Sequence, residues 1–382
     1  MIYDNFLIDS FEPLYLTVDK IGPFQEKVWT FDFTDTNNEP CNFYFFISEN
    51  GRGKTTLLEL MVALMRMLGH REMDTFEYEG LDKGEGRVQW DIRLRLKREG
   101  RSESVVFSLI AGFIGADTSL KAWGTDELEE VGAESWHRFG FRKRKSGRLE
   151  LVGKSDELAK DFIDAIQNFS GDRPQGFEDD PMTFPTLLYF SAYRDILPIQ
   201  DKRSISAPEE WGYKTVHSFT QEGVRWLKSL DNLLVWLTWL DDGRFERAKD
   251  IINERVFKGT LKYLKKVRKD PPGAIIENEG KEHRLDQLSS GEKCLVQMFL
   301  RIGAHMTRNT ILLIDEMDVH LHTKWQHRLL NQLKQMAKEH PGLTIIVSTH
   351  SREILERFHY DMEEENLRKG GHIIEDDDIK SG

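Results

Sequence analysis

The chain has 382 residues, of which 39% are hydrophobic and 31% are charged. This composition excludes a membrane-spanning protein, because no run of about 18 apolar residues occurs. The length corresponds to roughly two or three domains. The formal net charge of −12 excludes a protein whose entire surface binds nucleic acid, so any such contact is expected from a local basic patch.

The cysteine content and the N-terminus predict the cellular compartment. Cys41 and Cys294 are the two cysteines of the chain, and no C-x-x-C motif occurs, which argues against a disulfide scaffold and against a zinc or redox motif. The first residues carry acidic side chains and no basic segment, unlike a secretory signal. We therefore expect a cytoplasmic protein.

Hydrophobic patterning predicts mostly β structure in the first half of the chain. Alternating or continuous apolar runs indicate strands, which lie at residues 6–19, 28–33 and 42–48, in a hairpin over 86–115, and at 186–194. Apolar residues at helical spacing predict helices over 57–68 and 155–169. A loop is expected over 170–181.

The second half of the chain predicts mainly helices and two further buried strands. Helical spacing covers residues 221–240 and continues over 244–269, until Pro271. The remaining elements are a hairpin over 274–285, a helix from 288 to 306, a strand over 310–316, a helix over 322–340, a strand over 343–350, a helix over 352–358, and an edge strand from 372 that frays into the acidic tail 375–378.

A phosphate-binding loop follows the apolar strand at 42–48. Residues 48–55 read SENGRGKT and match the pattern G-x-x-x-x-G-K-[ST] at every defined position except the first, where serine replaces glycine. The glycines allow backbone N–H groups to face a phosphate, and the following helix directs its positive end there. The predicted ATP-binding residues are Asn50, Gly51, Arg52, Gly53, Lys54, Thr55 and Thr56. The alternative is a glycine-rich turn with a chance Lys-Thr pair.

A second candidate motif is the acidic pair that ends the strand at 310–316. Uncompensated charge at the end of a buried strand is costly, and a Mg²⁺ ion held by Asp315 and Thr55 would compensate it. Glu316 then lies where it could activate the attacking water. The alternative is an acidic strand end that faces solvent.

Two shorter motifs complete the set. Ser289, Ser290, Gly291 and Glu292 open a helix whose first N–H groups could bind an anion, although plain helix capping explains them equally well. His350 follows the last buried strand and could contact a γ-phosphate, although a lone histidine is more often structural.

In their joint order, these motifs resemble the ABC-type ATPase heads of the branch shared by SMC-like, RecF-like and OLD-like proteins. The resemblance covers roughly residues 1–70 and 280–355. It implies a Walker A motif at 48–55, a signature at 289–292, a Walker B motif at 311–316, a dimer-facing D-loop at Asp318 and a switch histidine at His350. It also implies ATP and Mg²⁺ as ligands, with Glu316 as catalytic base.

The same resemblance implies the architecture. The fold class is α/β, an ABC ATPase head with a mostly parallel P-loop sheet, an N-terminal antiparallel β layer and an inserted helical lid. The expected parts are 1–85 with Walker A, a β-rich and basic insertion at 86–182, the Q-loop region and helical lid at 183–280, and 281–382 with the remaining motifs. It further implies a head-to-head dimer in which the signature of one subunit closes on the ATP of the other.

Local runs narrow the choice within this family. Residues 314–326, IDEMDVHLHTKWQ, are similar to a run in bacterial anti-phage and OLD-like ATPases, with Thr323 in place of proline. The run SAYRD at 191–195, followed by tryptophan-rich helices, resembles the ATPase subunit of Septu systems (PtuA), and related ATPases serve PARIS systems and some retrons. His320 and His322 could instead be a metal pair, but a third ligand is not in view.

Other candidate residues have less support. Gln200 is the glutamine nearest to the expected Q-loop and could contact Mg²⁺ or water. Arg52 and Arg194 could be phosphate contacts or structural. A basic run could hold a nucleic-acid backbone, with Trp136, Phe139 and Phe141 stacking on bases. This run consists of Arg138, Arg142, Lys143, Arg144, Lys145 and Arg148.

The favoured hypothesis is an ATPase that forms a homodimer or higher oligomer and restrains a separate nuclease or toxin in anti-phage defence, with no membrane contact. OLD nucleases carry a C-terminal TOPRIM domain, for which the segment after His350 is too short, so no nuclease is expected in this chain. The alternative is a RecF-like DNA-repair ATPase that clamps duplex DNA through 138–148. A transporter subunit is disfavoured by the His-Leu-His run and by the large lid.

Overall fold

The computed structural model describes most of the chain. The described residues are 6–98, 100–115, 119–169, 184–319, 321–351, 353, 354, 356, 358 and 366–374. Their strands form two six-stranded sheets and one three-stranded sheet. The predicted loop at 170–181, His320 and the acidic tail at 375–378 lie outside the described residues.

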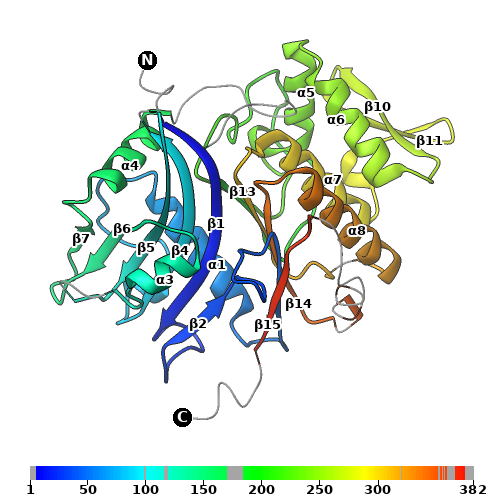
Figure 1. Ribbon diagram of the computed structural model, residues 1–382. Coiled ribbons are helices and arrows are strands. Elements are labelled where there is room, and N and C mark those ends of the chain that lie inside the picture. The colour runs from blue at the N-terminus through cyan, green and yellow to red at the C-terminus, as the bar shows by residue number, and fades with distance from the viewer. Residues whose placement is uncertain are drawn as a thin grey trace.

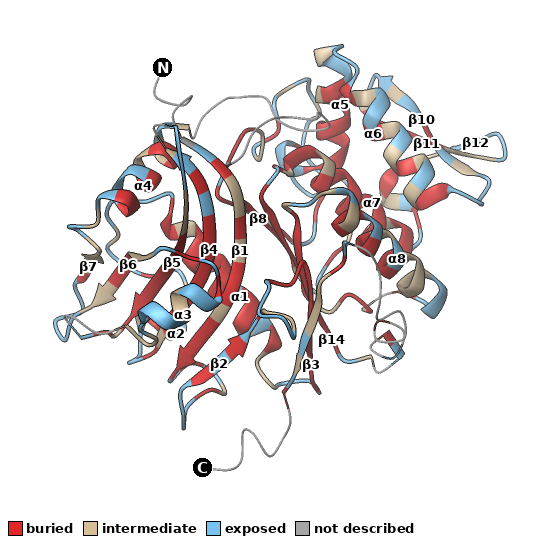
Figure 2. Ribbon diagram, viewed as in Figure 1, coloured by how far each residue is buried: buried red, intermediate tan, exposed pale blue. Residues whose placement is uncertain are grey.

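The central sheet is parallel throughout. Its strands, in spatial order, are β15 (Lys369–Ile373), β3 (Phe43–Ile47), β14 (Thr344–Thr349), β13 (Thr310–Ile314), β8 (Thr186–Phe190) and β9 (Val216–Phe219). The middle strands read as continuous apolar runs because both faces of the sheet are covered, and Figure 2 shows them as buried. The predicted parallel P-loop sheet is confirmed.

Each face of this sheet contributes to a different core. In β13, Ile311 and Leu313 pack in one hydrophobic cluster together with α1 (Lys54–Met67), whereas Leu312 and Ile314 belong to a second cluster with α7 (Ser290–His305) and α8 (Thr323–Glu339). The period-two alternation of a strand produces this division. The phosphate-loop helix α1 and the helix after the signature therefore lie on opposite faces of the sheet.

The N-terminal β layer is a second six-stranded sheet on the α1 side (Figure 1). Its order is β2 (Trp29–Asp32), β1 (Phe6–Asp19), β4 (Arg87–Arg98), β5 (Arg101–Gly112), β6 (Ser135–Lys143) and β7 (Leu149–Val152). Neighbours are antiparallel except β5 and β6. Helix α1 contacts both large sheets, so it is held between them. The layer also carries α2 (Glu79–Asp82), α3 (Thr125–Glu130) and α4 (Glu157–Phe169).

The lid contains helices and a small sheet. It comprises a 3-10 turn (Trp226–Lys228), α5 (Leu230–Leu240), α6 (Arg244–Ile252), a π turn (Asn253–Phe257), β10 (Lys262–Lys269), β11 (Pro272–Asn278), β12 (Lys281–His283) and a 3-10 turn (Leu285–Gln287). Ser229 caps α5 by accepting the N–H of Asn232 at 3.1 Å. The helix expected over 221–240 is therefore confirmed from residue 230 onward.

One secondary-structure prediction is wrong. Residues 262–269, expected to continue a helix, form β10, which pairs with β11 along its full length. Gly259 adopts φ 79°, a left-handed conformation that ends a helix. The lysine-rich segment after it is compatible with either structure, and pairing with the apolar strand β11 decides in favour of a strand.

None of the helices in the described ranges is both long and apolar enough to span a membrane.

A buried histidine pair joins the parallel sheet to the end of α7. The rings of His217 and His305 lie 4.1 Å apart between centroids, and each residue is 1% exposed. Burial lowers the pKa of both imidazoles, against the attraction of Glu210 for His217. The folded protein therefore holds both rings neutral, whereas in the unfolded chain they titrate near a pKa of about 6.5.

This pair predicts acid sensitivity of the fold. Below about pH 6.5 the unfolded chain binds more protons than the folded one, so stability falls as pH decreases, by up to about 1.4 kcal/mol per pH unit for each histidine. Denaturant unfolding between pH 7.5 and 5.5 should show a shallower loss for His305→Leu than for the wild type. His70→Leu, on an exposed position after α1, is the matched control and should keep the wild-type slope. Equal slopes for His305→Leu and wild type would contradict the account.

Candidate functional site

The predicted motifs meet at the carboxyl edge of the parallel sheet. The phosphate loop follows β3, the Asp315-Glu316 pair follows β13, and His350 follows β14. The order β3-β14-β13-β8 makes these strands neighbours. Carboxyl ends of parallel strands are the usual place for ligands in open α/β sheets, and segments up to about 300 residues apart in sequence are brought together there.

Lys54 fills the phosphate loop. Its ammonium donates to the carbonyl oxygens of Ser48 at 2.7 Å and Glu49 at 2.9 Å, and to the Ser48 hydroxyl at 3.1 Å. Burial lowers the pKa of Lys54, while the carboxylates of Glu316, Asp315 and Asp318 oppose that shift. Ser48, the departure from the phosphate-loop pattern, thus serves as an additional acceptor for the lysine within the loop.

Glycine is required at the end of this loop. Gly53 has φ 92°, and a Cβ placed there would lie 2.6 Å from Pro23 Cγ and 2.7 Å from Phe24 Cζ. Any other residue would be strained in this backbone conformation and would clash with the segment that packs over the loop. Helix α1 begins at Lys54, directly after Gly53. Its first backbone N–H groups therefore lie at the loop.

Thr55 and Asp315 form the candidate metal site. The Thr55 hydroxyl donates to Asp315 Oδ2 at 2.9 Å, and the Ser348 hydroxyl donates to Asp315 Oδ1 at 2.6 Å. Asp315 is 2% exposed, so its carboxylate relies on these bonds and on nearby Lys54. A hydroxyl and a carboxylate oxygen side by side are ligands that suit Mg²⁺, so the residues fit the ion that the resemblance implies.

Glu316 has a constrained backbone and an unoccupied carboxylate. Its φ of 45° is left-handed, which costs a non-glycine residue about 1–2 kcal/mol. Its N–H donates to Ser348 Oγ at 2.8 Å, and its carbonyl oxygen accepts from Arg194 Nη2 at 2.9 Å. Among the described residues, none hydrogen-bonds to the Glu316 carboxylate. A partly exposed, unengaged carboxylate beside the metal site is what a general base requires.

Asp318 holds the candidate switch histidine. Its Oδ2 lies 3.1 Å from His350 Nε2, and its Oδ1 accepts from the Thr349 hydroxyl at 2.7 Å. The Asp318 side chain is 4% exposed, whereas the His350 side chain is 46% exposed. The carboxylate is thus turned into the chain rather than toward solvent, and it orients the ring of His350.

The signature segment caps α7 and contacts the lid. Ser289 and Glu292 form a reciprocal capping box. Both Glu292 oxygens also accept from Lys262 Nζ of β10 at 2.9 Å. Burial raises the pKa of Glu292, but the bonds from Lys262 and Ser289 outweigh it and leave the pKa lowered. Ser289 and Ser290 are exposed and Gly291 is buried.

Several predicted residues are not brought to this site. Gln200 is exposed and donates its backbone N–H to Val224 at 3.2 Å; within the described residues its side chain makes no hydrogen bond to Thr55 or Asp315. Arg52 lies in the phosphate loop itself, where its Nη2 is 3.9 Å from Glu49 Oε2. In the described part of the chain, no group of His, Cys, Asp or Glu is arranged to hold a metal ion as a cluster of at least three. His322 precedes α8 and is exposed.

The basic run on β6 and β7 is partly neutralised. Glu150 pairs with Arg142 and Arg144, each at 2.5 Å, Lys143 donates to the carbonyl oxygen of Asp82, and the Arg138 guanidinium stacks on Trp136. Phe139 and Phe141 are buried and cannot stack on bases, contrary to the prediction.

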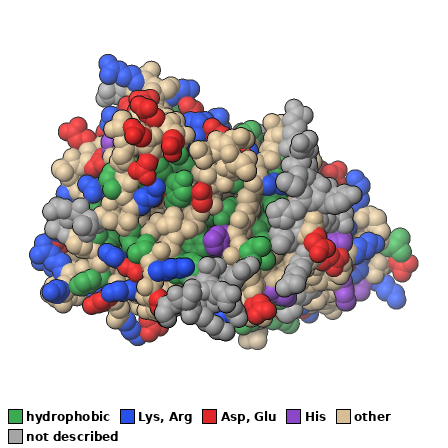
Figure 3. Space-filling view, turned by 60° about the horizontal axis from the view of Figure 1, so that its bottom comes forward, with side chains coloured by type: hydrophobic (Ala, Val, Ile, Leu, Met, Phe, Trp, Pro, Cys, Tyr) green, Lys and Arg blue, Asp and Glu red, His purple; other side chains and the backbone are tan. Residues whose placement is uncertain are grey.

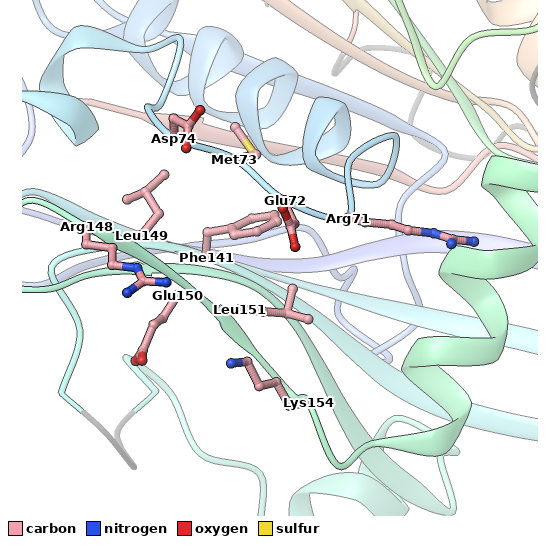
Figure 4. Close-up of a pocket in the computed structure, with 10 residues that line it drawn as sticks. All are labelled: Arg71, Glu72, Met73, Asp74, Phe141, Arg148, Leu149, Glu150, Leu151 and Lys154. Carbon is pink, nitrogen blue, oxygen red and sulfur yellow. The ribbon is translucent and has the colours of Figure 1, made fainter.

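A cavity of about 460 Å³ beside this run has mixed charge. Arg148 and Lys154 line one side and Glu72 and Asp74 the other (Figure 4). Arg71 points away from it toward Asp164 of α4, with which it pairs at 3.0 Å. On the face drawn in Figure 3, cationic and anionic side chains are likewise interspersed. Neither view indicates a uniform phosphate-binding surface.

Arg194 is a site residue whose role the sequence left open. It follows β8, is 3% exposed, and donates to the carbonyl oxygens of Asp315 at 2.6 Å and Glu316 at 2.9 Å. In the sequence, the position of Arg194 after an apolar strand was the signal for a site residue. The contacts themselves leave no sequence pattern, because the acceptors are backbone atoms more than 100 residues away.

A parallel sheet with a lysine-filled phosphate loop, a hydrogen-bonded Thr55–Asp315 pair and a capped helix at 289–292 is the arrangement expected of an ATPase of the ABC type. A family model described as "AAA domain, putative AbiEii toxin, Type IV TA system" matches residues 49–356. Since this match spans most of the chain, the chain belongs to that family, whose members are ABC-like ATPase domains.

Two curated relatives carry retron names. The chain is 29% identical over 100 residues to the "Retron Ec83 probable ATPase" of Escherichia coli, which covers 23% of this chain and 18% of that protein. It is 30% identical over 122 residues to the "Retron Vc95 probable ATPase" of Vibrio cholerae serotype O1 biovar El Tor. This match covers 28% of this chain and 23% of that protein. The matched part thus spans less than a quarter of each relative.

Two solved structures match the chain at low sequence identity. A dimeric ATP-binding cassette with ADP and Pi bound has 12% identity and a TM-score of 0.32, over 89% of each chain. The recombination mediator protein RecF has 10% identity and a TM-score of 0.33, over 91% of this chain and 95% of that one.

The contact between Ser48 and Lys54 predicts that removal of the Ser48 hydroxyl slightly increases the affinity for Mg-ATP. In Ser48→Ala, a hydrogen bond worth about 1 kcal/mol no longer holds Lys54 within the loop, so Mg-ATP should bind about twofold to tenfold more tightly. Titration with a fluorescent ATP analogue measures this. A tenfold loss of affinity would contradict the description of Ser48 as a competing acceptor.

Proposed function

We propose that this chain binds and hydrolyses ATP as a homodimer or higher oligomer and thereby controls a separate effector, a nuclease or toxin, in defence against phage. The observation that supports it most is the meeting of Lys54, the Thr55–Asp315 pair and the unengaged Glu316 at one edge of the sheet. These are the groups that phosphoryl transfer to water needs within one site.

Binding begins at the phosphate loop. The N–H groups around Gly51, Gly53 and the start of α1 surround the β-phosphate, and Lys54 exchanges the carbonyl oxygens of Ser48 and Glu49 for phosphate oxygens. Thr55 and Asp315 would hold Mg²⁺, which when bound would supply positive charge to the phosphates of the nucleotide. Asp315 remains oriented by Ser348 throughout.

Hydrolysis requires a positioned water. Glu316 accepts a proton from that water as it attacks the γ-phosphorus, the bond to the β–γ bridging oxygen breaks, and ADP and phosphate are formed. His350 Nε2 is engaged by Asp318, so the hydrogen bond to the γ-phosphate would come from Nδ1 of a doubly protonated ring. The proton on Glu316 then returns to solvent or to the departing phosphate.

A second copy of the chain completes the site in this proposal. Ser289 and Ser290 are exposed at the start of α7, and within the described residues no hydrogen bond or ion pair connects residues 289–292 with the phosphate loop. Helix N-termini with unengaged N–H groups attract phosphate. We infer that this segment acts on the nucleotide of a partner subunit.

The defence role is supported by the names of the relatives. The two relatives reported above are named as probable ATPases of retrons, and the family description mentions a toxin system. The segments matched by these relatives are 100 and 122 residues long. For this chain, the effector and its control are therefore part of the proposal.

Substitution of the proposed base should separate binding from turnover. In Glu316→Gln the carboxamide cannot accept the proton, so turnover should fall at least a hundredfold, while Mg-ATP still binds and the dimer persists. Light scattering with ATP and a phosphate-release assay measure both. Lys54→Ala is the control that should lose nucleotide binding. Wild-type turnover in Glu316→Gln would remove Glu316 as the base.

The second candidate function is a RecF-like clamp on duplex DNA. Exposed Lys145, Arg148 and Lys154 favour it. The neutralisation of Arg142 and Arg144 by Glu150 and the burial of Phe139 and Phe141 weaken it, because fewer cations remain to displace counterions from phosphates.

Affinity purification of the tagged chain from its native locus distinguishes these functions. We expect a stoichiometric, neighbour-encoded nuclease or toxin, identified by mass spectrometry, and little nucleic acid by staining of the same eluate. Duplex DNA without a protein partner, released by salt, would contradict effector control and favour the clamp.

A further inference from the structure

Arg194 lies at a junction of three elements. Its Nη1 donates to the carbonyl oxygens of Ser191 at 2.7 Å and Asp315 at 2.6 Å, with a longer contact of 3.4 Å to Phe190. Its Nη2 donates to the Glu316 carbonyl at 2.9 Å. Its Nε lies 3.3 Å from Cys294 Sγ of α7. The side chain thereby connects the end of β8, the end of β13 and α7.

Fold stability alone explains this arrangement poorly. Arg194 is 3% exposed, and all these acceptors are neutral; within the described residues no carboxylate forms a salt bridge with it. A buried cation without an ionic partner is expensive, and an apolar side chain of similar volume would fill the space at lower cost. The planar fork matches two adjacent carbonyl oxygens in a way that lysine cannot reproduce.

Two of the four carbonyl acceptors, those of Asp315 and Glu316, belong to residues of the proposed chemistry. The Glu316 peptide is fixed from two sides, by Ser348 at its N–H and by Arg194 at its carbonyl oxygen. These bonds offset the cost of its left-handed φ of 45°. Without the guanidinium, the Glu316 backbone could relax to φ below zero, and the carboxylate would turn away from its present position, from which its charge acts on Lys54.

The junction also reaches the signature helix. Cys294 lies two residues beyond the signature in α7, and the neighbouring residues Asp195 and Lys293 form an ion pair at 3.1 Å. Two adjacent residues after β8, Arg194 and Asp195, therefore contact two adjacent residues of α7, Cys294 and Lys293. A shift of α7, on which a second subunit would act, is transmitted through these contacts to the carbonyl oxygens of Asp315 and Glu316.

We propose that Arg194 is a positioning residue that holds the Glu316 carboxylate in its hydrolytic orientation and makes that orientation depend on the position of α7. This inference rests on the proposed ATPase function. It requires that loss of the guanidinium slows turnover while leaving the phosphate loop, and therefore nucleotide affinity, nearly intact.

The test is the split between kcat and KM in Arg194→Gln and Arg194→Lys. We expect kcat to fall at least tenfold in Arg194→Gln, with KM and the Kd for Mg-ATP within about threefold of wild type (about 0.7 kcal/mol). Arg194→Lys retains the charge but lacks the fork, so it should regain only part of kcat. If Arg194→Gln does not fold, Arg194→Lys and the cysteine variant below carry the test.

Cys294→Ala removes the contact between Arg194 and the thiol on α7 and leaves the Asp195–Lys293 ion pair in place. It should lower kcat by a smaller factor in the wild-type background and have little further effect in Arg194→Gln, as expected of two residues that act through one contact. Cys41→Ala, at the other buried cysteine, is the matched control and should leave kcat unchanged.

The outcomes are distinguishable. Wild-type kcat in Arg194→Gln would overturn the inference and leave the ATPase function standing. Parallel losses of kcat, Mg-ATP affinity and melting temperature would also overturn it, because they indicate a purely structural role. Additive effects of Arg194→Gln and Cys294→Ala would remove the link to α7. A wild-type protein that binds Mg-ATP only as weakly as Lys54→Ala would overturn the proposed function and this inference together.

Discussion

The hydrogen bonds of the Asp315 carboxylate are the contacts on which the rest of the site depends. Thr55 binds one oxygen and Ser348 binds the other, so the start of α1 and the end of β14 are both tied to the end of β13. A carboxylate that is 2% exposed is tolerable only where hydroxyls and a nearby cation replace water. The fold supplies these groups because β3, β14 and β13 are consecutive in the parallel sheet.

At the same carboxyl edge of the parallel sheet, Glu316 has a locally unfavourable backbone conformation. Its backbone is held in a left-handed conformation by Ser348 and Arg194, and its carboxylate is left unengaged by the described residues. The adjoining Asp318 is used in the opposite way, because its carboxylate is occupied by Thr349 and His350. Three acidic side chains within four residues thus have distinct tasks, which are set by their partners rather than by residue type.

The phosphate loop, the parallel strands and α1 could be predicted from sequence because their signals are contiguous in the chain. Gly51, Gly53, Lys54 and Thr55 fall in one run, and the strands around them are continuous apolar segments. The parallel P-loop sheet and the β layer expected from the family resemblance are confirmed.

Long-range contacts were beyond sequence reasoning. Arg194 acts on backbone carbonyls of residues 315 and 316, and backbone acceptors leave no mark in a sequence pattern. The ion pair of Glu292 with Lys262 depends on β10, which was expected to be helical because its lysine-rich sequence suits both structures. Burial of Phe139 and Phe141 follows from the alternation of β6 against α1 and α4, which the surrounding basic residues obscured.

The most direct test of the central claim is an experimental structure of the chain with Mg²⁺ and a non-hydrolysable ATP analogue. The account predicts that Lys54 Nζ leaves the carbonyl oxygens of Ser48 and Glu49 for phosphate oxygens, that Mg²⁺ lies between Thr55 and Asp315, and that the Glu316 carboxylate faces the γ-phosphate. A nucleotide bound elsewhere, with Lys54 still hydrogen-bonded to Ser48, would contradict it.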